Sequence, residues 1–99
     1  MEYKMSHIYK KDTCHNPICL QLKQVGCSVF DMSMIGNGAP DALVRYNNKW
    51  AFFEFKSKYG KLTDAQIKWR KDNPQWHMYL FQVRTFEEAC SILRIKINQ

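Results

Sequence analysis

The sequence predicts a single mixed α/β domain. Helical patterns and strand-like runs follow one another in the order helix, three strands, helix, strand, helix. A chain of 99 residues can form one domain with one modest core. A composition that is 45% hydrophobic and 14% aromatic is typical of folded chains rather than of disordered ones. We therefore expect residues 1–99 to form one folded unit.

The first helix is expected to begin at Asn16-Pro17, because an asparagine cap followed by proline at the first helical position is a common helix start. If Asp12-Thr13 is the cap instead, the helix begins earlier. Gly26 would end it, and residues 27–32 then have strand character. The glycines and proline of residues 35–40 indicate a loop. The inward face of the helix would consist of Ile18, Leu22 and Val25.

Two strand-like runs, residues 41–46 and 49–58, are separated by Asn47-Asn48. Asparagine tolerates positive φ, so two of them between strands predict a tight hairpin. A two-residue turn also fixes the register, which places Asp41 directly opposite Glu54. Since side chains alternate along strands, Asp41, Glu54 and Lys56 are expected on one face of the sheet.

The second half of the chain contains two capping boxes. Thr63-Asp64-Ala65-Gln66 begins the second helix, which Asn73-Pro74 ends, and Thr85-Phe86-Glu87-Glu88 begins the last one. Residues 77–83 are apolar and uncharged, which suits a strand in a buried position. The expected inward residues are Leu62, Ala65 and Trp69 for the second helix, and Phe86, Ala89, Cys90 and Leu93 for the last.

Positive charge is concentrated in one segment. The chain has a net charge of +6, and residues 56–71 contain six basic side chains against a single acidic one. Such a segment is typical of surfaces that bind polyanions, although a solvated basic helix face is the common alternative. Lys58, Lys61, Lys68 and Lys71 are candidate contacts to nucleic-acid phosphates. Tyr59, Trp69 and Trp76 are candidates for stacking on bases, with core packing the alternative for Trp69.

The cysteines and the apolar runs indicate a cytoplasmic protein. The four cysteines form no CxxC pair, so we expect buried, reduced thiols rather than a disulfide framework. Part of a metal site at Cys14-His15 and Cys19 is the alternative. No apolar run approaches the length of a membrane span, and the first residues lead into no signal-like stretch.

The predicted hairpin brings two carboxylates together. Opposed residues on one face have Cβ atoms about 4.5–5.5 Å apart, so the two charges repel unless they share a proton or a cation. Hard oxygen ligands suit Mg²⁺ or Mn²⁺, and Lys56 beside them could stabilise negative charge. This set suits metal-dependent phosphodiester hydrolysis. Each residue also has an ordinary interpretation: Asp41 as a turn residue, Glu54 and Lys56 as the polar side of a strand.

The spacing of Pro40-Asp41 and Glu54-Phe55-Lys56 resembles the PD-(D/E)xK nuclease superfamily. With Gly36-Asn37-Gly38 before the aspartate and Gly60-Lys61-Leu62-Thr63 and Gln66 after the lysine, the segment is similar to the VRR-NUC branch. That branch includes small stand-alone phage and prophage proteins of about this length. The resemblance extends over roughly residues 12–93.

This resemblance implies a restriction-endonuclease-like core, a mixed four-stranded sheet flanked by helices. Asp41, Glu54 and the backbone carbonyl of Phe55 would bind Mg²⁺ or Mn²⁺, Lys56 would be the catalytic lysine, and Gln66 would lie near the metal. The resemblance further implies a DNA endonuclease, acting on branched structures among others. It also implies a homodimer in a bacterial cell or a phage-infected host.

The sequence departs from the superfamily at one point. Many members carry an acidic residue on the first helix that completes the metal site, but residues 13–25 contain none. A water, Gln21 or Asp12 would have to take that role, which favours one metal ion over two. The missing acid also supports an alternative function, a non-catalytic DNA-binding module with the nuclease fold. A third hypothesis is a metal-regulated protein whose basic helix binds an acidic partner.

Overall fold

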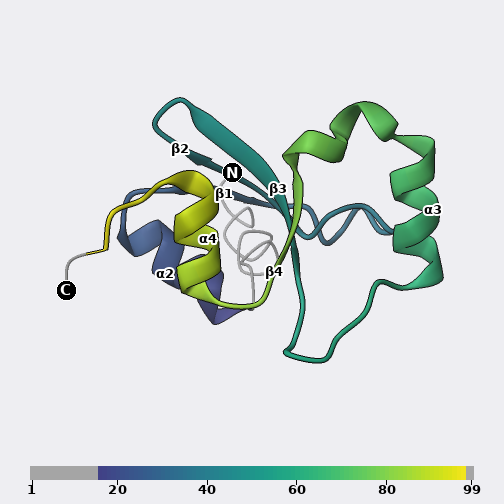
Figure 1. Cartoon of the computed structure of the whole chain (residues 1–99), viewed down its shortest axis with the longest axis horizontal. Coiled ribbons are helices and arrows are strands. Elements are labelled where there is room, and N and C mark those ends of the chain that lie inside the picture. The colour runs from purple at the N-terminus through teal and green to yellow at the C-terminus, as the bar shows by residue number, and fades with distance from the viewer. Residues whose placement is uncertain (1–15, 98–99) are drawn as a thin grey trace, which may run out of the picture.

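The computed structural model describes residues 16–97 and confirms a compact mixed α/β fold (Figure 1). Its sheet has four strands in the order β1-β2-β3-β4. Strand β2 runs antiparallel to both β1 and β3, and β4 runs parallel to β3. In chain order the elements are α2 (Pro17–Gln24), β1 (Ser28–Asp31), β2 (Ala42–Tyr46), β3 (Lys49–Phe55), α3 (Asp64–Asp72), the 3₁₀ helix η1 (Pro74–Tyr79), β4 (Leu80–Val83) and α4 (Phe86–Leu93).

Helix α2 begins where the sequence predicts. The Asn16 side chain accepts a hydrogen bond from the Ile18 amide at 2.9 Å, and the following proline occupies the first turn. The chain leaves the helix at Gly26, whose φ of 101° is readily adopted only by glycine. Val25 is the C-cap and is 40% exposed, so its predicted inward position is wrong. The alternative cap at Asp12-Thr13 lies outside the described residues.

The hairpin between β2 and β3 confirms the predicted turn. Asn47 has a φ of 55°, and Tyr46 pairs with Lys49 beside it. The ladder continues from this turn to the pair Ala42–Phe53. Alternation therefore places Ala42 and Phe53 on the face that carries the core, and Glu54 on the opposite face.

The core lies between one face of the sheet and the two helices α2 and α4, which pack side by side (Figure 1). The predicted inward residues of α4, Ala89, Cys90 and Leu93, are all buried there, with Phe86 packed against them. The other buried members are Ile18 and Leu22 of α2, Cys27, Ala42, Val44, Ala51, Phe53, Val83 and Ile95.

Residues 77–79 are not part of a strand, contrary to the sequence prediction. Pro74 begins a 3₁₀ helix that continues to Tyr79, so β4 contains only Leu80–Val83 and lies at the edge of the sheet. The cause is aromatic packing on the second face of the sheet. Tyr79 stacks on Trp50 with ring centroids 4.6 Å apart, and Trp76 meets Phe52 edge-on at 5.4 Å.

Helix α3 contributes no buried side chain to the core. Its predicted capping box is confirmed, with Thr63 and Gln66 each accepting a backbone hydrogen bond from the other residue. Ala65 is exposed, so its predicted inward position is wrong. The loop that precedes β2 contacts the backbone of α3 at this residue and not its side chain. A Cβ atom on Gly38 would lie 2.1 Å from the Ala65 carbonyl oxygen. Leu62 and Trp69 are half-buried.

Cys27 and Cys90 are buried free thiols, as predicted. Burial, with a smaller effect from the neighbouring Cys90, raises the pKa of Cys27 to about 11. Cys19 is disulfide-bonded, so the prediction of a reduced thiol is wrong for this residue. The candidate ligands Cys14 and His15 lie outside the described residues. None of the helices within residues 16–97 has the length and apolar character that crossing a membrane requires.

Gly38 and Gly36 offer a matched pair of substitutions. Both have positive φ, of 83° and 71°, but a Cβ on Gly36 would meet no atom within 4 Å. We expect Gly36→Ala to lower the free energy of unfolding by about 1–2 kcal/mol, from backbone strain alone. Gly38→Ala should lower the free energy of unfolding by about 1–3 kcal/mol more, because the new Cβ atom would displace the backbone of α3 at Ala65. Urea denaturation measures both, and equal losses would contradict the close contact.

Candidate active site

Glu54 is the buried charged residue among residues 16–97. Its side chain is on the second face of the sheet, and the residue is only 4% exposed. A carboxyl group at such a position needs hydrogen-bond partners or a counter-charge, because burial penalises the ionised form. The prediction that Glu54 is not an ordinary solvated strand residue is therefore consistent with its burial.

Asp41 reaches Glu54 by a different geometry from the predicted one. Regular strand pairing ends at Ala42–Phe53, and Asp41 lies in a bend whose amide donates to the Phe53 carbonyl at 3.0 Å. Its carboxylate Oδ2 accepts a hydrogen bond from the Phe55 amide at 2.8 Å. The two acids are thus not a ladder pair, yet their side chains lie close enough for the charge of Asp41 to raise the pKa of Glu54.

The electrostatics of this acid pair favour a retained proton. Burial first, then the charge of Asp41 and the hydrogen bond with it, raise the pKa of Glu54 from 4.5 to about 8. The positive charges of Lys56 and Arg70 oppose the shift. At neutral pH and without a cation, the Glu54 carboxyl group is therefore mostly protonated.

Gln66 connects the acid pair to Lys56. Its Oε1 accepts hydrogen bonds from Lys56 Nζ at 2.8 Å and from the Thr63 amide at 2.9 Å. Its Nε2 donates to Glu54 Oε2 at 2.5 Å, and Lys56 Nζ lies 4.0 Å from the same oxygen. The Gln66 side chain therefore completes the predicted capping box and also contacts both Glu54 and Lys56.

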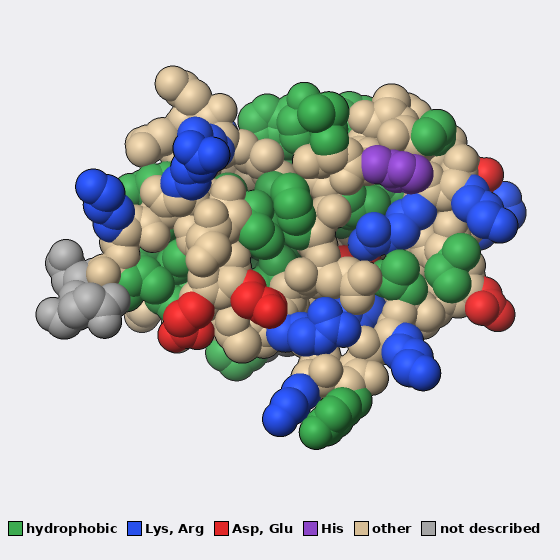
Figure 2. All heavy atoms as spheres, viewed as in Figure 1, with side chains coloured by type: hydrophobic (Ala, Val, Ile, Leu, Met, Phe, Trp, Pro, Cys, Tyr) green, Lys and Arg blue, Asp and Glu red, His purple; other side chains and the backbone are tan. Residues whose placement is uncertain are grey.

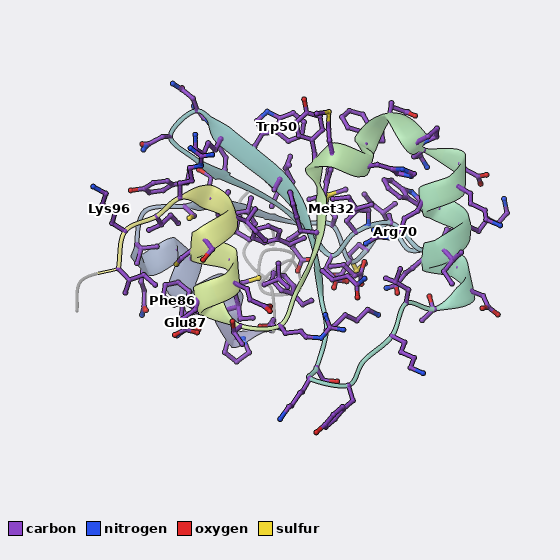
Figure 3. The ribbon with its side chains drawn as sticks, viewed as in Figure 1. Met32, Trp50, Arg70, Phe86, Glu87 and Lys96 are labelled. Atoms are coloured by element: carbon purple, nitrogen blue, oxygen red, sulfur yellow. The ribbon has the colours of Figure 1, made fainter. Side chains whose placement is uncertain are left out.

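Arg70 belongs to the same site and was not predicted. It follows Gln66 by one helical turn, so the two side chains project from the same side of α3. In Figure 3 Arg70 lies between α3 and the sheet. Its Nη2 is buried and has no hydrogen-bond partner within residues 16–97. The i, i+4 spacing from Gln66 was the available signal in the sequence.

The oxygen atoms of the site fit a hard divalent cation. The carboxyl groups of half-buried Asp41 and buried Glu54 lie close together, and a cation bound there would replace the proton that Glu54 retains at neutral pH. Throughout residues 16–97, no three His, Cys, Asp or Glu side chains are grouped so that they could hold a metal. Within these residues, the third ligand expected from the sequence is the backbone carbonyl of Phe55. Gln21 is exposed on α2, which packs against the other face of the sheet, and Asp12 lies outside the described residues.

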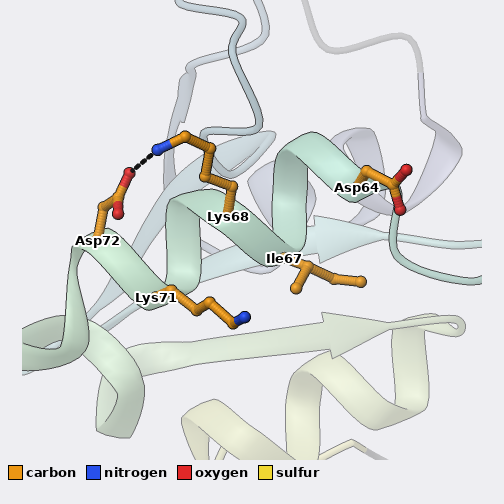
Figure 4. A pocket seen from close by; sticks show the side chains of 5 residues that line it. All are labelled: Asp64, Ile67, Lys68, Lys71 and Asp72. Atoms are coloured by element: carbon orange, nitrogen blue, oxygen red, sulfur yellow. Dashed lines mark hydrogen bonds and ion pairs between the residues drawn. The ribbon is translucent and has the colours of Figure 1, made fainter.

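The predicted phosphate contacts are exposed lysines that lie outside this site. Lys58 and Lys61 are exposed on the loop between β3 and α3, and Lys68 and Lys71 are exposed on α3. Figure 2 shows basic side chains gathered over this part of the surface. Lys68 forms an ion pair with Asp72 at 2.7 Å, beside a shallow depression on the outer side of α3 (Figure 4). His77 is in η1, where its Nε2 lies 2.7 Å from the Arg70 carbonyl oxygen.

Comparison with known proteins gave no match, either to a family model, to a curated protein or to a solved structure. The contacts of the side chains are thus the basis for assigning a function.

The raised pKa of Glu54 predicts how stability depends on pH without metal. Between pH 4.5 and about 8 the folded state retains a proton that the unfolded chain releases, so the free energy of unfolding falls as pH rises. Glu54→Gln should flatten this part of the profile, measured as melting temperature from pH 4.5 to 9 in EDTA. Glu87→Gln, at an exposed position of α4, is the control and should leave the slope unchanged. An unchanged slope in Glu54→Gln would contradict the shared proton.

Proposed function

We propose that the protein is a divalent-metal-dependent DNA endonuclease of the VRR-NUC type, with a restriction-endonuclease-like core. One observation carries this proposal: buried Glu54, which lies beside half-buried Asp41, is joined to Lys56 by the side chain of Gln66. The element order and the mixed sheet support the fold assignment. As a member of this family, the protein would act in the cytoplasm of a bacterial or phage-infected cell.

The acid pair supplies the proposed metal ligands. Asp41, Glu54 and the carbonyl of Phe55 would hold one Mg²⁺ or Mn²⁺ ion. When bound, such an ion neutralises charge on the attacked phosphate and lowers the pKa of a bound water. The Phe55 amide fixes one oxygen of Asp41, and Gln66 fixes one oxygen of Glu54, so neither carboxylate has to be ordered when the cation arrives.

Lys56 supplies the proposed electrophilic group. Its ammonium is held by Gln66 rather than by a direct short contact to Glu54, which leaves part of its hydrogen-bonding capacity for a phosphate oxygen or a water. A positive group fixed beside the reacting phosphate stabilises the negative charge that develops in the transition state. Arg70 adds a second positive charge close to the acid pair.

DNA would be held by its phosphates. Exposed Lys58 and Lys61 on the loop, and exposed Lys71 on α3, form no ion pair with another described residue, whereas Lys68 pairs with Asp72. Contacts of this kind give affinity that falls steeply with salt, and they carry no sequence information.

We also propose a homodimer, because one small domain offers little surface to a DNA substrate. Phe30 on the edge strand β1 is exposed, as are Met34 and Ile35 in the loop that follows. Apolar side chains grouped at a sheet edge are typical of a surface that another chain covers. Light scattering should give twice the mass of the chain, and a fully active monomer would contradict the proposal.

Lys56→Ala should lower the kcat of cleavage by at least about 100-fold, because the fixed positive charge is lost. Its affinity for DNA should stay within a few-fold of the unaltered protein, since the other lysines remain. Nicking of supercoiled plasmid with Mn²⁺ measures the first effect, and filter binding in EDTA measures the second. Lys49→Ala, at the opposite end of β3 from Lys56, is the control. If Lys56→Ala cleaves DNA at the normal rate, the proposed role of Lys56 in catalysis is wrong.

The alternative, a non-catalytic DNA-binding module, remains the second candidate because no acid on α2 completes the metal site. It predicts that the unaltered protein and Asp41→Asn both bind DNA and that neither nicks the plasmid. The nuclease proposal predicts nicking by the unaltered protein alone.

A further inference from the structure

The loop between β3 and α3 projects from the body of the protein (Figure 1). Tyr59 lies in this loop and is 82% exposed, more than any other exposed large hydrophobic residue in the described part of the chain. An isolated exposed apolar side chain is common and by itself indicates nothing. What distinguishes Tyr59 is the way in which the backbone around it is held.

Arg84 braces the loop on both sides of Tyr59. Its Nε donates to the Lys58 carbonyl at 3.3 Å, and its Nη2 donates to the Gly60 carbonyl at 2.8 Å. The Gly60 amide closes a turn on the Ser57 carbonyl at 3.0 Å. The ring is therefore presented to solvent from an ordered backbone, so little conformational entropy is lost when a ligand covers it.

The backbone of Arg84 is held by a residue of α4. Its backbone amide donates to Glu88 Oε1 at 2.6 Å, within the capping box of α4. The start of the loop is joined to the end of β4 by a hydrogen bond from the Lys56 amide to the Val83 carbonyl. The loop is thus tied to the last strand and the last helix, although it is far from both in sequence.

Positive charge accompanies the exposed ring. Lys58 Nζ lies 5.5 Å from the Tyr59 ring centroid, and Lys61 is exposed two residues farther on. At the lower edge of Figure 2, hydrophobic and basic side chains project together where this loop lies. Aromatic side chains among lysines are typical of proteins that bind single-stranded nucleic acid, since the bases stack on the rings and the phosphates pair with the lysines.

We propose that Tyr59 is a stacking site for an unpaired nucleobase. In a fully paired duplex the base faces are covered by their neighbours, so the site would favour DNA with at least one exposed base. Tyr59 follows Lys56 by three residues, roughly 10 Å of extended chain at most. If the proposed nuclease function is correct, the stacked base therefore lies within a few nucleotides of the phosphate that is cut.

The test measures binding of a short single-stranded oligonucleotide in EDTA, so that no cleavage is required. Tyr59→Ala should weaken binding about 5- to 100-fold, the range that corresponds to the loss of one stacked base. Tyr59→Trp should retain the affinity. The control is Leu20→Ala, which removes a side chain that is 61% exposed on α2, and it should bind normally. A fully paired duplex of the same length should show little difference among these proteins.

Two results would overturn the stacking site. Unchanged oligonucleotide affinity in Tyr59→Ala would exclude it, and this is also the result expected if the loop binds a protein instead. An equal loss for single-stranded and fully paired DNA would mean that the loop contacts the DNA backbone only. Both results can be read even if the unaltered protein never nicks plasmid DNA, so failure of the nuclease proposal is distinguishable from failure of this one.

Discussion

The arrangement of the site depends on the hydrogen bonds of one amide side chain. Gln66 completes the start of α3, accepts from Lys56 and donates to the buried Glu54. These three roles require the helix, the lysine and the acid to be in place together. Because α3 has no buried side chain, these bonds and the contact with Gly38 help to determine where the helix lies. The same hydrogen bonds therefore determine both the position of α3 and the geometry of the site.

The sequence predicted those parts of the fold that depend on local interactions. The cap at Asn16, the turn at Asn47-Asn48 and the two capping boxes each involve residues close together in the chain, and all are present. The 3₁₀ helix at Pro74 was missed, because it depends on distant packing of Trp76 and Tyr79 against the aromatic residues of β3. Strand-like composition at residues 77–79 gave no sign of that packing.

The same distinction applies to the site. Register and alternation predicted that Asp41, Glu54 and Lys56 share a face, and the family resemblance predicted that Gln66 lies near them. The bend at Asp41 could not be predicted, since there a side-chain oxygen takes the place of a backbone acceptor for the Phe55 amide. Nor could the burial of the Arg70 Nη2 atom, which follows from how closely α3 approaches the sheet.

The absence of buried side chains from α3 has a kinetic consequence. Cooperative units with few apolar contacts open most readily, so α3 is expected to detach before α2 or α4, whose inward residues belong to the core. Each such opening would withdraw Gln66 and release Lys56 and Glu54 while the sheet stays intact. The time for which Gln66, Lys56 and Glu54 stay in contact would then depend on how often α3 detaches, and not on global unfolding. A ligand that contacts α3 would lengthen that time.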